Sequence, residues 1–351
     1  MTEHQPFFDA TGLLATPAAL LERLRADGYL YVRGILPAAD VAAVRRHVLA
    51  VADQAGWLLP AGPGAPAPPA DPRAAVWDPD PVYRSVHRRM WTHRDVHALM
   101  HHPRLLSLLT TLTGHRGLLV HPRKVLRAVH PRPHPAGLES GWHQDWPEIQ
   151  GSENTLTVWT PLAPAGPDTG ALAILPASHR HGTLPLRLAP TAVGWEADIH
   201  PRQTQLALTR HINPGDVLLF TPHTVHHGTP NTSRHLRLSL DARYQPASEP
   251  ISETCLELRD EPYGWESVYA HWPHQGHDPL AHYWKRHTRL NPVPYDPRFD
   301  TWRERTALAA GNRHDPRARR ALEITAAHGT PTLATRATAL LRTLPTTRPP
   351  R

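Results

Sequence analysis

Residues 235–243 read His-Leu-Arg-Leu-Ser-Leu-Asp-Ala-Arg, and polar and apolar side chains alternate at every step of this stretch. Because successive side chains of a strand point to opposite faces of a sheet, the alternation predicts a strand with one apolar and one polar face. We expect the apolar face to pack on covering helices and the polar face to line a cavity. Residues 155–162 predict a second such strand, with Thr155, Thr157 and Trp159 on one face and Leu156, Val158 and Leu162 on the other.

The chain around these two strands reads as an antiparallel β-core. From about residue 118 to residue 245, strand-like runs alternate with turns rich in Gly and Pro. Ahead of this core the sequence predicts a short strand at 29–33 and helices at 17–27, 38–54 and 95–113, the last of them broken at Pro103. Helices followed by a long β-run predict an α+β architecture.

The composition changes after Pro246. A loop-rich segment studded with Trp and Tyr comes first, and helices are then predicted from Asp315 to Gly329 and from Pro331 to about Leu344. We therefore expect one domain over residues 1–250, with its β-core at about 118–245. Residues 251–351 are expected to form an extension of loops and helices packed on that core.

Composition limits the class of protein. The single cysteine, Cys255, rules out an internal disulfide and fits a reducing, cytoplasmic compartment. No secretory leader and no run of 18 apolar residues is present, so no membrane role is expected. The formal charge is +7, but its arginines are spread along the chain without a basic motif interleaved with aromatics. We therefore expect no nucleic-acid partner, and the oligomeric state stays open.

Residues 141–146, Gly-Trp-His-Gln-Asp-Trp, carry the chemistry. His143 and Asp145 form a His-x-Asp pair, His226 follows roughly eighty residues later, and Arg237 comes eleven residues after that. Two imidazoles and one carboxylate on one face of iron(II) leave the opposite face open for other ligands. On an extended strand, His143 and Asp145 would point the same way. The pair alone is a weak signal in a chain with 27 histidines, so the motifs around it determine whether it indicates a metal site.

Those surroundings form an ordered series of motifs. They are Arg123-Lys124-Val125-Leu126-Arg127, the His143 pair, Gly151-Ser152, residues 156–162, Gly170-Ala171-Leu172, residues 175–180, Pro214-Gly215-Asp216-Val217 and residues 226–237. The series resembles the phytanoyl-CoA dioxygenase (PhyH) family of iron(II)/2-oxoglutarate oxygenases from about Leu20 to Gln245. This resemblance implies a double-stranded β-helix, the jelly-roll or cupin-like fold. It also implies iron(II), 2-oxoglutarate and dioxygen, with hydroxylation of an unactivated C–H bond of a small-molecule substrate such as a natural product.

The resemblance also implies roles for individual residues. His143, Asp145 and His226 would be the catalytic metal ligands, and Arg237 would hold the distal carboxylate of 2-oxoglutarate through a planar guanidinium fork. Trp159 matches a position beside the keto acid.

Two further residues are expected near the cofactor. Lys124 could contact 2-oxoglutarate, although a solvated lysine is an alternative, and Gln144 falls at the edge of the cofactor pocket.

His226 and His227 compete for the third ligand position. Adjacent residues of a strand point to opposite faces, so both cannot bind one ion without a bulge. The following Gly228 favours His227, because family members often carry a His-Gly pair. The spacings to Asn231 and Arg237 favour His226. Two spacings outweigh one neighbouring glycine, so His226 is the predicted ligand.

Two alternatives remain at this point. A cupin-like isomerase or metal-dependent binding protein would use the same core without oxygen chemistry, but it would not need Arg237. An oxygenase of this kind could also desaturate or cyclise its substrate. Halogenases of the superfamily lack the carboxylate ligand, so Asp145 argues for an oxygenation.

Overall fold

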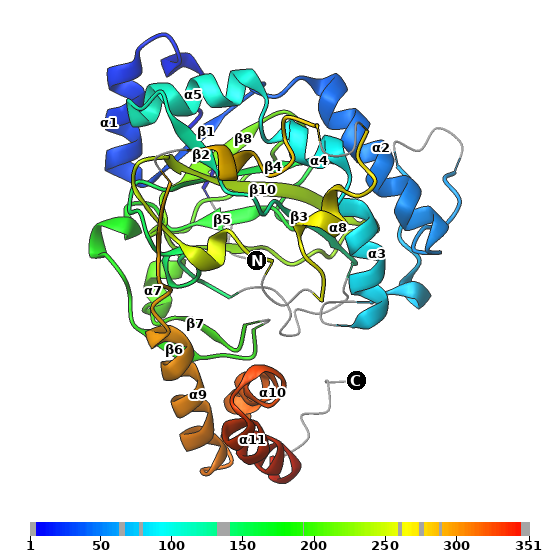
Figure 1. Cartoon of the computed structure of the whole chain (residues 1–351), viewed down its shortest axis with the longest axis vertical. Coiled ribbons are helices and arrows are strands. Elements are labelled where there is room, and N and C mark those ends of the chain that lie inside the picture. Colours follow the sequence, from blue (N-terminus) through cyan, green and yellow to red (C-terminus); the bar gives the residue numbers. More distant parts are fainter. Residues whose placement is uncertain are drawn as a thin grey trace.

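A six-stranded antiparallel sheet lies at the centre of the protein (Figure 1). The computed structural model describes residues 5–344 apart from 63–66, 77–79, 132–140, 192, 259–261, 274–276 and 288–289. The strand order is β1 (Tyr29–Val32), β8 (Val217–Phe220), β4 (Leu156–Pro161), β10 (Arg237–Pro246) and β2 (Leu118–Val120), and β3 (Val125–Val129) also pairs with β10. The two alternating stretches are therefore neighbouring strands, with Asp241 opposite Trp159.

Helices cover one face of this sheet. Leu238 and Leu240 of β10 and Val158 of β4 belong to the largest cluster of buried apolar side chains. The helices that contribute to the same cluster are α1 (Pro17–Asp27), α2 (Ala38–Gln54), α3 (Pro81–Trp91), α4 (Arg94–Leu99), α5 (Pro103–Thr113) and α8 (Trp265–Tyr269). The predicted apolar faces of both strands are thus the faces that pack on helices.

A small sheet lies against the other face. β5 (Leu172–Ile174) pairs antiparallel with β9 (His226–Gly228). Leu172 and Ile174 share an apolar cluster with Trp159 of β4 and Leu218 of β8. Two sheets therefore lie face to face, and side chains of β9, β4 and β10 that point between them form most of the candidate site.

The remaining elements are short. β6 (Leu186–Leu188) and β7 (Trp195–Ala197) form an antiparallel hairpin that α7 (Pro201–Thr204) follows. β11 (Pro250–Ser252) and β12 (Asn291–Val293) form a parallel pair, and α6 (Trp146–Ile149) is a single turn. Short 3-10 helices are Thr11–Leu13, Pro72–Ala74, Ser178–His181, Glu253–Cys255, Tyr283–Arg286 and Pro316–Ala318.

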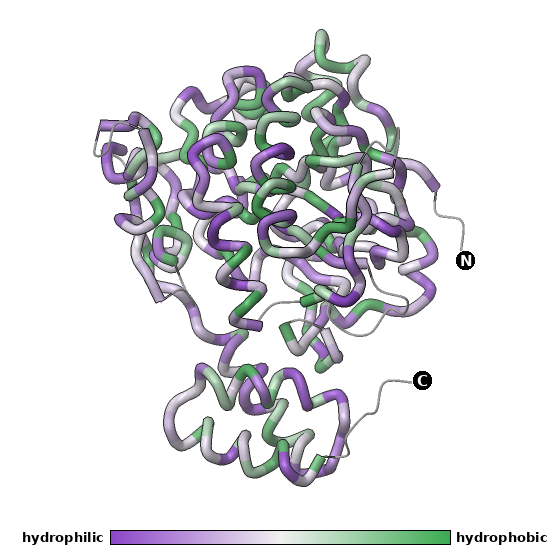
Figure 2. Tube along the Cα trace, turned by 90° about the vertical axis from the view of Figure 1, so that its right-hand side faces the viewer, coloured by the Kyte–Doolittle hydropathy of each residue, from purple (hydrophilic) through white to green (hydrophobic). Residues whose placement is uncertain are grey.

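The C-terminal part of the chain divides into two pieces. Trp265, Tyr269 and Trp284 join the main core, so the loop-rich segment packs on the central body. The helices α9 (Arg298–Gly311), α10 (Arg319–His328) and α11 (Pro331–Thr343) instead enclose an apolar cluster of their own. This C-terminal helical unit projects from the body in Figure 2. It meets the body at the β6–β7 hairpin, where Leu188 packs against its cluster.

Most predicted helices agree with the structure. α1, α2, α4, α5, α10 and α11 fall where the sequence predicts helices, and Pro103 separates α4 from α5. α3 and α9, and the short helices α6, α7 and α8, were not predicted. In the described part of the chain, no helix combines the length and apolar character that a membrane span requires.

Candidate metal centre

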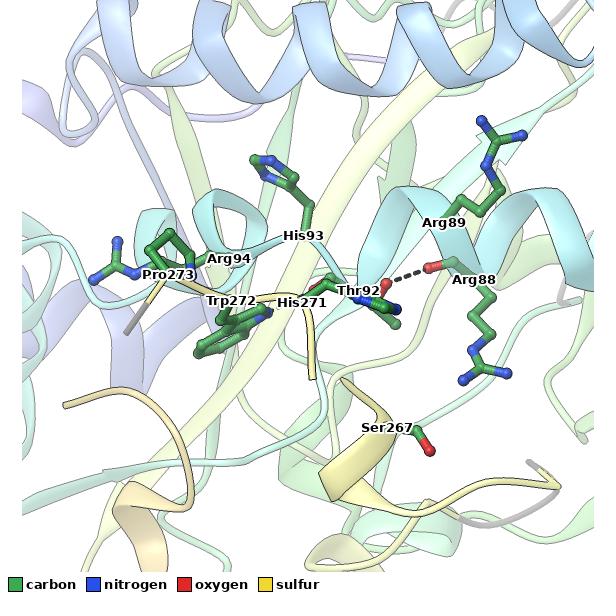
Figure 3. A pocket seen from close by; sticks show the side chains of 9 residues that line it. All are labelled: Arg88, Arg89, Thr92, His93, Arg94, Ser267, His271, Trp272 and Pro273. Atoms are coloured by element: carbon green, nitrogen blue, oxygen red, sulfur yellow. Dashed lines mark hydrogen bonds between the residues drawn. The ribbon is translucent and has the colours of Figure 1, made fainter. Parts of the chain in front are cut away.

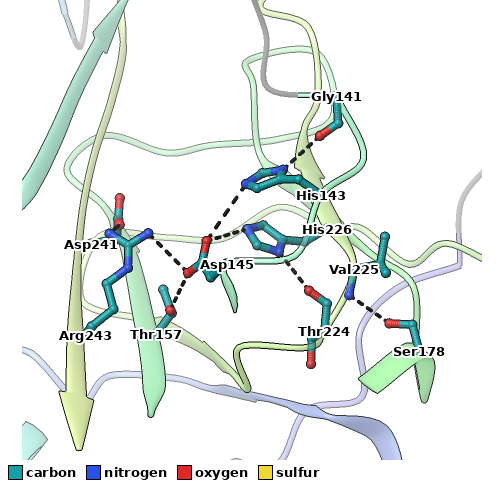
Figure 4. Close-up of polar contacts among 10 residues, drawn as sticks. All are labelled: Gly141, His143, Asp145, Thr157, Ser178, Thr224, Val225, His226, Asp241 and Arg243. Atoms are coloured by element: carbon teal, nitrogen blue, oxygen red, sulfur yellow. Dashed lines mark hydrogen bonds and ion pairs between the residues drawn. The ribbon is translucent and has the colours of Figure 1, made fainter. Parts of the chain in front are cut away.

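His143, Asp145 and His226 come together between the two sheets. One potential ligand atom from each lies within 4.8 Å of the other two, and no other group of three His, Cys, Asp or Glu among the described residues does so. Asp145 Oδ1 is 4.0 Å from Nε2 of His143 and 3.8 Å from Nε2 of His226 (Figure 4). Two imidazole nitrogens and one carboxylate oxygen are a donor set that suits iron(II), so these residues fit the metal.

The backbone holds the two histidines side by side. His143 and His226 exchange two N–H···O hydrogen bonds of 2.9 Å each, which fixes their separation. Asp145 differs from the expectation of an extended strand, because its backbone is α-helical (φ −70°, ψ −24°) and it is the N-cap of α6. The His-x-Asp spacing therefore brings both side chains to one centre through a strand-to-helix transition, since α6 begins directly after Asp145.

Hydrogen bonds orient both imidazoles. Nδ1 of His143 lies 2.8 Å from the carbonyl of Gly141, and Nδ1 of His226 lies 3.0 Å from the carbonyl of Thr224. A carbonyl only accepts, so each Nδ1 carries the proton and each Nε2 presents its lone pair to the centre. Burial lowers the pKa of His143 to about 3 and also lowers the pKa of His226. Both rings are therefore neutral near pH 7, as metal binding requires.

Asp145 is held by its second carboxylate oxygen. Oδ2 accepts hydrogen bonds from the Thr157 hydroxyl at 2.6 Å and from Nη2 of Arg243 at 3.1 Å, which leaves Oδ1 facing the histidines (Figure 4). Arg243 also donates to Asp241 at 2.6 Å. Burial alone would raise the pKa of Asp145, but the positive charge of Arg243 and the hydrogen bond from Thr157 lower it below its usual value. Asp145 is therefore ionised.

Arg243 is a residue that sequence reasoning placed on the polar face without a role. The same alternation that predicts Arg237 on that face also puts Arg243 there. The signal was present, but only the structure shows that Arg243 reaches Asp145, 98 residues away in sequence.

His227 points away from the triad. Its ring lies against Trp142, with ring centroids 4.0 Å apart, while His226 faces Asp145. The structure therefore brings His226, and not His227, to His143 and Asp145. Gly228 lies against Arg237, because a Cβ at this position would be 2.9 Å from Nη1 of Arg237. A glycine two residues after His226 leaves room for that guanidinium in its present place.

Arg237 lies beside the strand that carries His226. Its side chain is buried, with 8% of the residue exposed, and Nη2 reaches Ser239 at 3.4 Å. Gly228 is two residues beyond His226, a step of about 6.6 Å along a strand. A short dicarboxylate such as 2-oxoglutarate can span that separation.

Trp159 has a buried donor without an acceptor. Its indole Nε1 makes no hydrogen bond to any described residue, although the side chain is almost completely buried. Such orphan donors are rare because desolvating an N–H costs free energy. Trp159 lies on the same face as Thr157, which binds Asp145. An anionic cofactor at this place would supply the missing acceptor, so the site fits 2-oxoglutarate.

Lys124 does not have the contacts expected of a cofactor ligand. Its ammonium lies 2.6 Å from the carbonyl of His121, 3.2 Å from that of Pro122 and 3.0 Å from the Tyr283 hydroxyl. Three oxygens use the three protons of the group. The expected contact with 2-oxoglutarate therefore has no support in the structure, and neither does the alternative of a solvated lysine, since Lys124 is 2% exposed.

The side chain of Gln144 forms hydrogen bonds to two loops. Its amide nitrogen donates to the carbonyls of Gly182 and His223, and its amide oxygen accepts from the N–H of Leu184. The side chain thus ties the segment after residue 181 to the turn before His226. This position gives no support to the expected place at the edge of the cofactor pocket.

A separate cleft of about 300 Å³ lies between α3, α4 and the segment after α8, and three arginines line it. Their guanidinium groups point in different directions (Figure 3). Arg88 stacks on Tyr263, 3.6 Å from the ring centroid, and Arg94 pairs with Asp278. Because Arg88, Arg89 and Arg94 do not converge on one point, the cleft does not form a second anion site.

Comparisons with known proteins place the chain among oxygenases. A family model described as phytanoyl-CoA dioxygenase (PhyH) matches residues 24–239. Two curated relatives, the 1-deoxypentalenic acid 11-beta-hydroxylases of Streptomyces arenae and Streptomyces exfoliatus, are each 28% identical over 259 residues, which is 69% of this chain and 86% of theirs. A solved apo structure of the non-heme monooxygenase ThoJ has a TM-score of 0.46 and 23% identity, covering 65% of this chain and 77% of that one.

Proposed function

The chain belongs to the phytanoyl-CoA dioxygenase family of iron(II)- and 2-oxoglutarate-dependent oxygenases, and we propose that it hydroxylates an unactivated C–H bond of a small natural product. In that reaction one atom of dioxygen enters the C–H bond of the substrate. The other enters 2-oxoglutarate, which loses carbon dioxide and becomes succinate.

We propose that His143, Asp145 and His226 hold the iron. The observation that carries this assignment is the convergence of two Nε2 atoms and Asp145 Oδ1 within 4.8 Å of one another. Iron(II), when bound with 2-oxoglutarate and dioxygen, supplies the oxidising chemistry. The protein residues keep both imidazoles neutral, keep Asp145 ionised and direct a single carboxylate oxygen at the metal.

We propose that Arg237 and Trp159 bind 2-oxoglutarate. Arg237 offers a charged, planar fork in a buried position, which suits the distal carboxylate. Trp159 offers an unused N–H on the same side of the central sheet. The two sheets that face each other across these residues support a double-stranded β-helix as the fold that carries the site.

Hydroxylation is favoured over desaturation, cyclisation and non-oxidative chemistry. The two curated relatives are hydroxylases by name, and the same name gives their substrate as an acid, 1-deoxypentalenic acid. The buried arginine at position 237 has no purpose in a cupin-like isomerase that uses no 2-oxoglutarate. Asp145 fills the position that a halogenase would leave to chloride.

The test is an isotope experiment. Protein loaded with iron(II) would be incubated with 2-oxoglutarate, ¹⁸O₂ and a panel of natural products, and succinate release would identify the active compound. We expect one labelled oxygen in the product and one in succinate. A product that has lost two hydrogens and gained no oxygen would replace hydroxylation with desaturation or cyclisation. Turnover of a compound without 2-oxoglutarate consumption would contradict the proposal.

A further inference from the structure

A third arginine lies on the face of the central sheet that carries Arg237 and Asp241. Arg127 belongs to β3 and stands directly opposite Ser239 of β10. Directly opposed residues of an antiparallel pair point to the same face. Ser239 lies between Arg237 and Asp241 in the alternation, and the neighbours Leu126 and Ala128 pack in the helix-covered core. The Arg127 side chain is therefore directed to the same side of the sheet as the metal ligands.

Arg127 differs from the other two arginines on this face in its exposure. Arg237 is buried, and Arg243 has only 16% of its side chain exposed and binds two aspartates. Arg127 is exposed. Among the residues that the structure describes, no hydrogen bond or ion pair to its guanidinium is present. In the described parts of the chain β3 pairs with β10 alone, so it forms an edge of the described sheet at this point.

The open side of the triad is the side of His143. Its side chain is 17% exposed, whereas those of Asp145 and His226 are 6% exposed. Arg127 stands opposite Ser239, whose hydroxyl lies 3.4 Å from Nη2 of Arg237. Arg127 is therefore a neighbour of the residue that we propose holds 2-oxoglutarate.

The charges of the loaded site leave Arg127 without a counter-charge. Iron(II), Asp145, Arg237 and the two carboxylates of 2-oxoglutarate together carry no net charge, and Arg243 is balanced by Asp241. One positive charge then remains on this face. On either side of Arg127 along β3, Val125 and Val129 are half-buried and share its face. The surface is an arginine set between two apolar side chains.

We infer that Arg127 binds a carboxylate of the organic substrate, so that the substrate is an apolar molecule with one anionic group. This inference rests on the proposed function and names the substrate class of the same site. Guanidinium and carboxylate form a charge-assisted, bidentate pair, which fixes orientation as well as adding affinity. The apolar body would then lie along the valines toward the open side of His143. Arg127 thus selects the substrate and its direction, while the iron site does the chemistry.

The experiment compares acids with their uncharged isosteres. A panel of apolar monocarboxylic acids, from decanoic acid to polycyclic terpenoid acids, would be assayed for stimulation of succinate release, each beside its primary amide. We expect the stimulating compounds to be acids whose amides fail. Arg127→Gln should raise the KM for such an acid by at least about tenfold and reduce the preference of acid over amide. Arg127→Lys, which keeps the charge, should restore part of the preference.

Two controls separate this inference from the proposed function. Arg104→Gln removes an exposed arginine at the start of α5, outside the site, and should leave the KM unchanged. Arg127→Gln should still form the visible absorption band of an iron(II)–2-oxoglutarate chelate. If wild type itself showed no such band, the proposed function would be contradicted, and not only the role of Arg127. Stimulation by amides as strong as by acids, a screen in which no acid stimulates, or an unchanged KM in Arg127→Gln would overturn the role of Arg127.

Discussion

The carboxylate of Asp145 can present one oxygen to a metal because Thr157 and Arg243 hold the other. Arg243 is held in turn by Asp241, so a chain of three charged groups fixes the ligand. Without this chain Asp145 could rotate or bind through both oxygens. Arg243 therefore takes part in the geometry of the centre although it is not one of the three proposed ligands.

Arg243→Gln should therefore weaken metal binding. Loss of a residue that supports a metal ligand commonly costs about 10–100-fold in metal affinity. The measurement is an anaerobic Mn(II) titration of the purified variant. Arg94→Gln is the matched control, because it breaks the ion pair with buried Asp278 away from the site and should leave Mn(II) affinity unchanged. Equal Mn(II) affinity in wild type and Arg243→Gln would refute the positioning role.

Arg237→Gln should act on the co-substrate instead. Breaking a buried charge pair costs roughly 2–5 kcal/mol, so the apparent KM for 2-oxoglutarate should rise at least about tenfold while Mn(II) still binds. Arg237→Lys keeps the charge but loses the planar fork, so its KM for 2-oxoglutarate should lie between those of wild type and Arg237→Gln. Steady-state kinetics with varied 2-oxoglutarate decide the question. A KM like that of wild type would move the anchor to another residue.

At the scale of elements, the β6–β7 hairpin joins the C-terminal helical unit to the segment that carries His143. Gly194 of the hairpin has φ +79°, and a Cβ there would lie 2.8 Å from backbone atoms of Ala321 in α10. On its other side, the N–H of Ala197 donates to the carbonyl of Trp142 at 2.6 Å, next to His143. The hairpin thus contacts both the appended helices and the segment that carries His143.

Gly194→Ala should loosen this contact. A non-glycine residue at positive φ costs on the order of 1–3 kcal/mol, and the approach to Ala321 adds to that cost. Gly114→Ala is the matched control, since Gly114 also has positive φ (71°) but no atom stands within 4 Å of its Cβ position. Thermal unfolding should show the larger loss of melting temperature for Gly194→Ala. Equal losses would mean that close packing against α10 adds nothing.

His121, a buried histidine that directly follows β2, should make stability depend on pH. Burial lowers the pKa of His121 to about 4, and its Nε2 contacts Gln245 at 2.8 Å. In the unfolded chain the same group titrates near 6.5, so between pH 6.5 and 4 the unfolded state binds more protons. The free energy of unfolding should therefore fall, by up to about 3 kcal/mol from this residue, as pH drops through that window.

Chemical denaturation at several pH values measures this slope. His121→Gln should flatten it, and His115→Gln, which replaces an exposed histidine, should not. An unchanged slope in His121→Gln would assign the acid sensitivity to other groups.

At the scale of the whole molecule, the sequence predicted whatever depends on local periodicity. The alternation in residues 235–243 and 155–162 predicted two strands and the face that each turns to the helices. Contacts between side chains distant in sequence could not be predicted from local patterns. Lys124 donates to the Tyr283 hydroxyl, 159 residues away, and Gln144 accepts from the N–H of Leu184, 40 residues away. Local patterns do not reveal such partners, so the sequence could suggest only a place near the cofactor for both residues. Local rules also missed that Asp145 starts a helix.

The net charge is distributed unevenly over the molecule. Residues 298–351 hold 11 arginines and four acidic residues, so this segment alone accounts for the formal charge of +7. Residues 1–297 carry equal numbers of basic and acidic side chains. The overall charge therefore says little about the site, and the charges that matter there are those of Arg127, Arg237, Arg243, Asp145 and Asp241.

The central claim is that His143, Asp145 and His226 form an iron centre that chelates 2-oxoglutarate. The most direct test is an anaerobic titration of iron(II) and 2-oxoglutarate into wild type, His226→Ala and His227→Ala, followed by visible absorption. We predict the absorption band of the chelate in wild type and in His227→Ala, and none in His226→Ala. A band that survives in His226→Ala and disappears in His227→Ala would contradict the account.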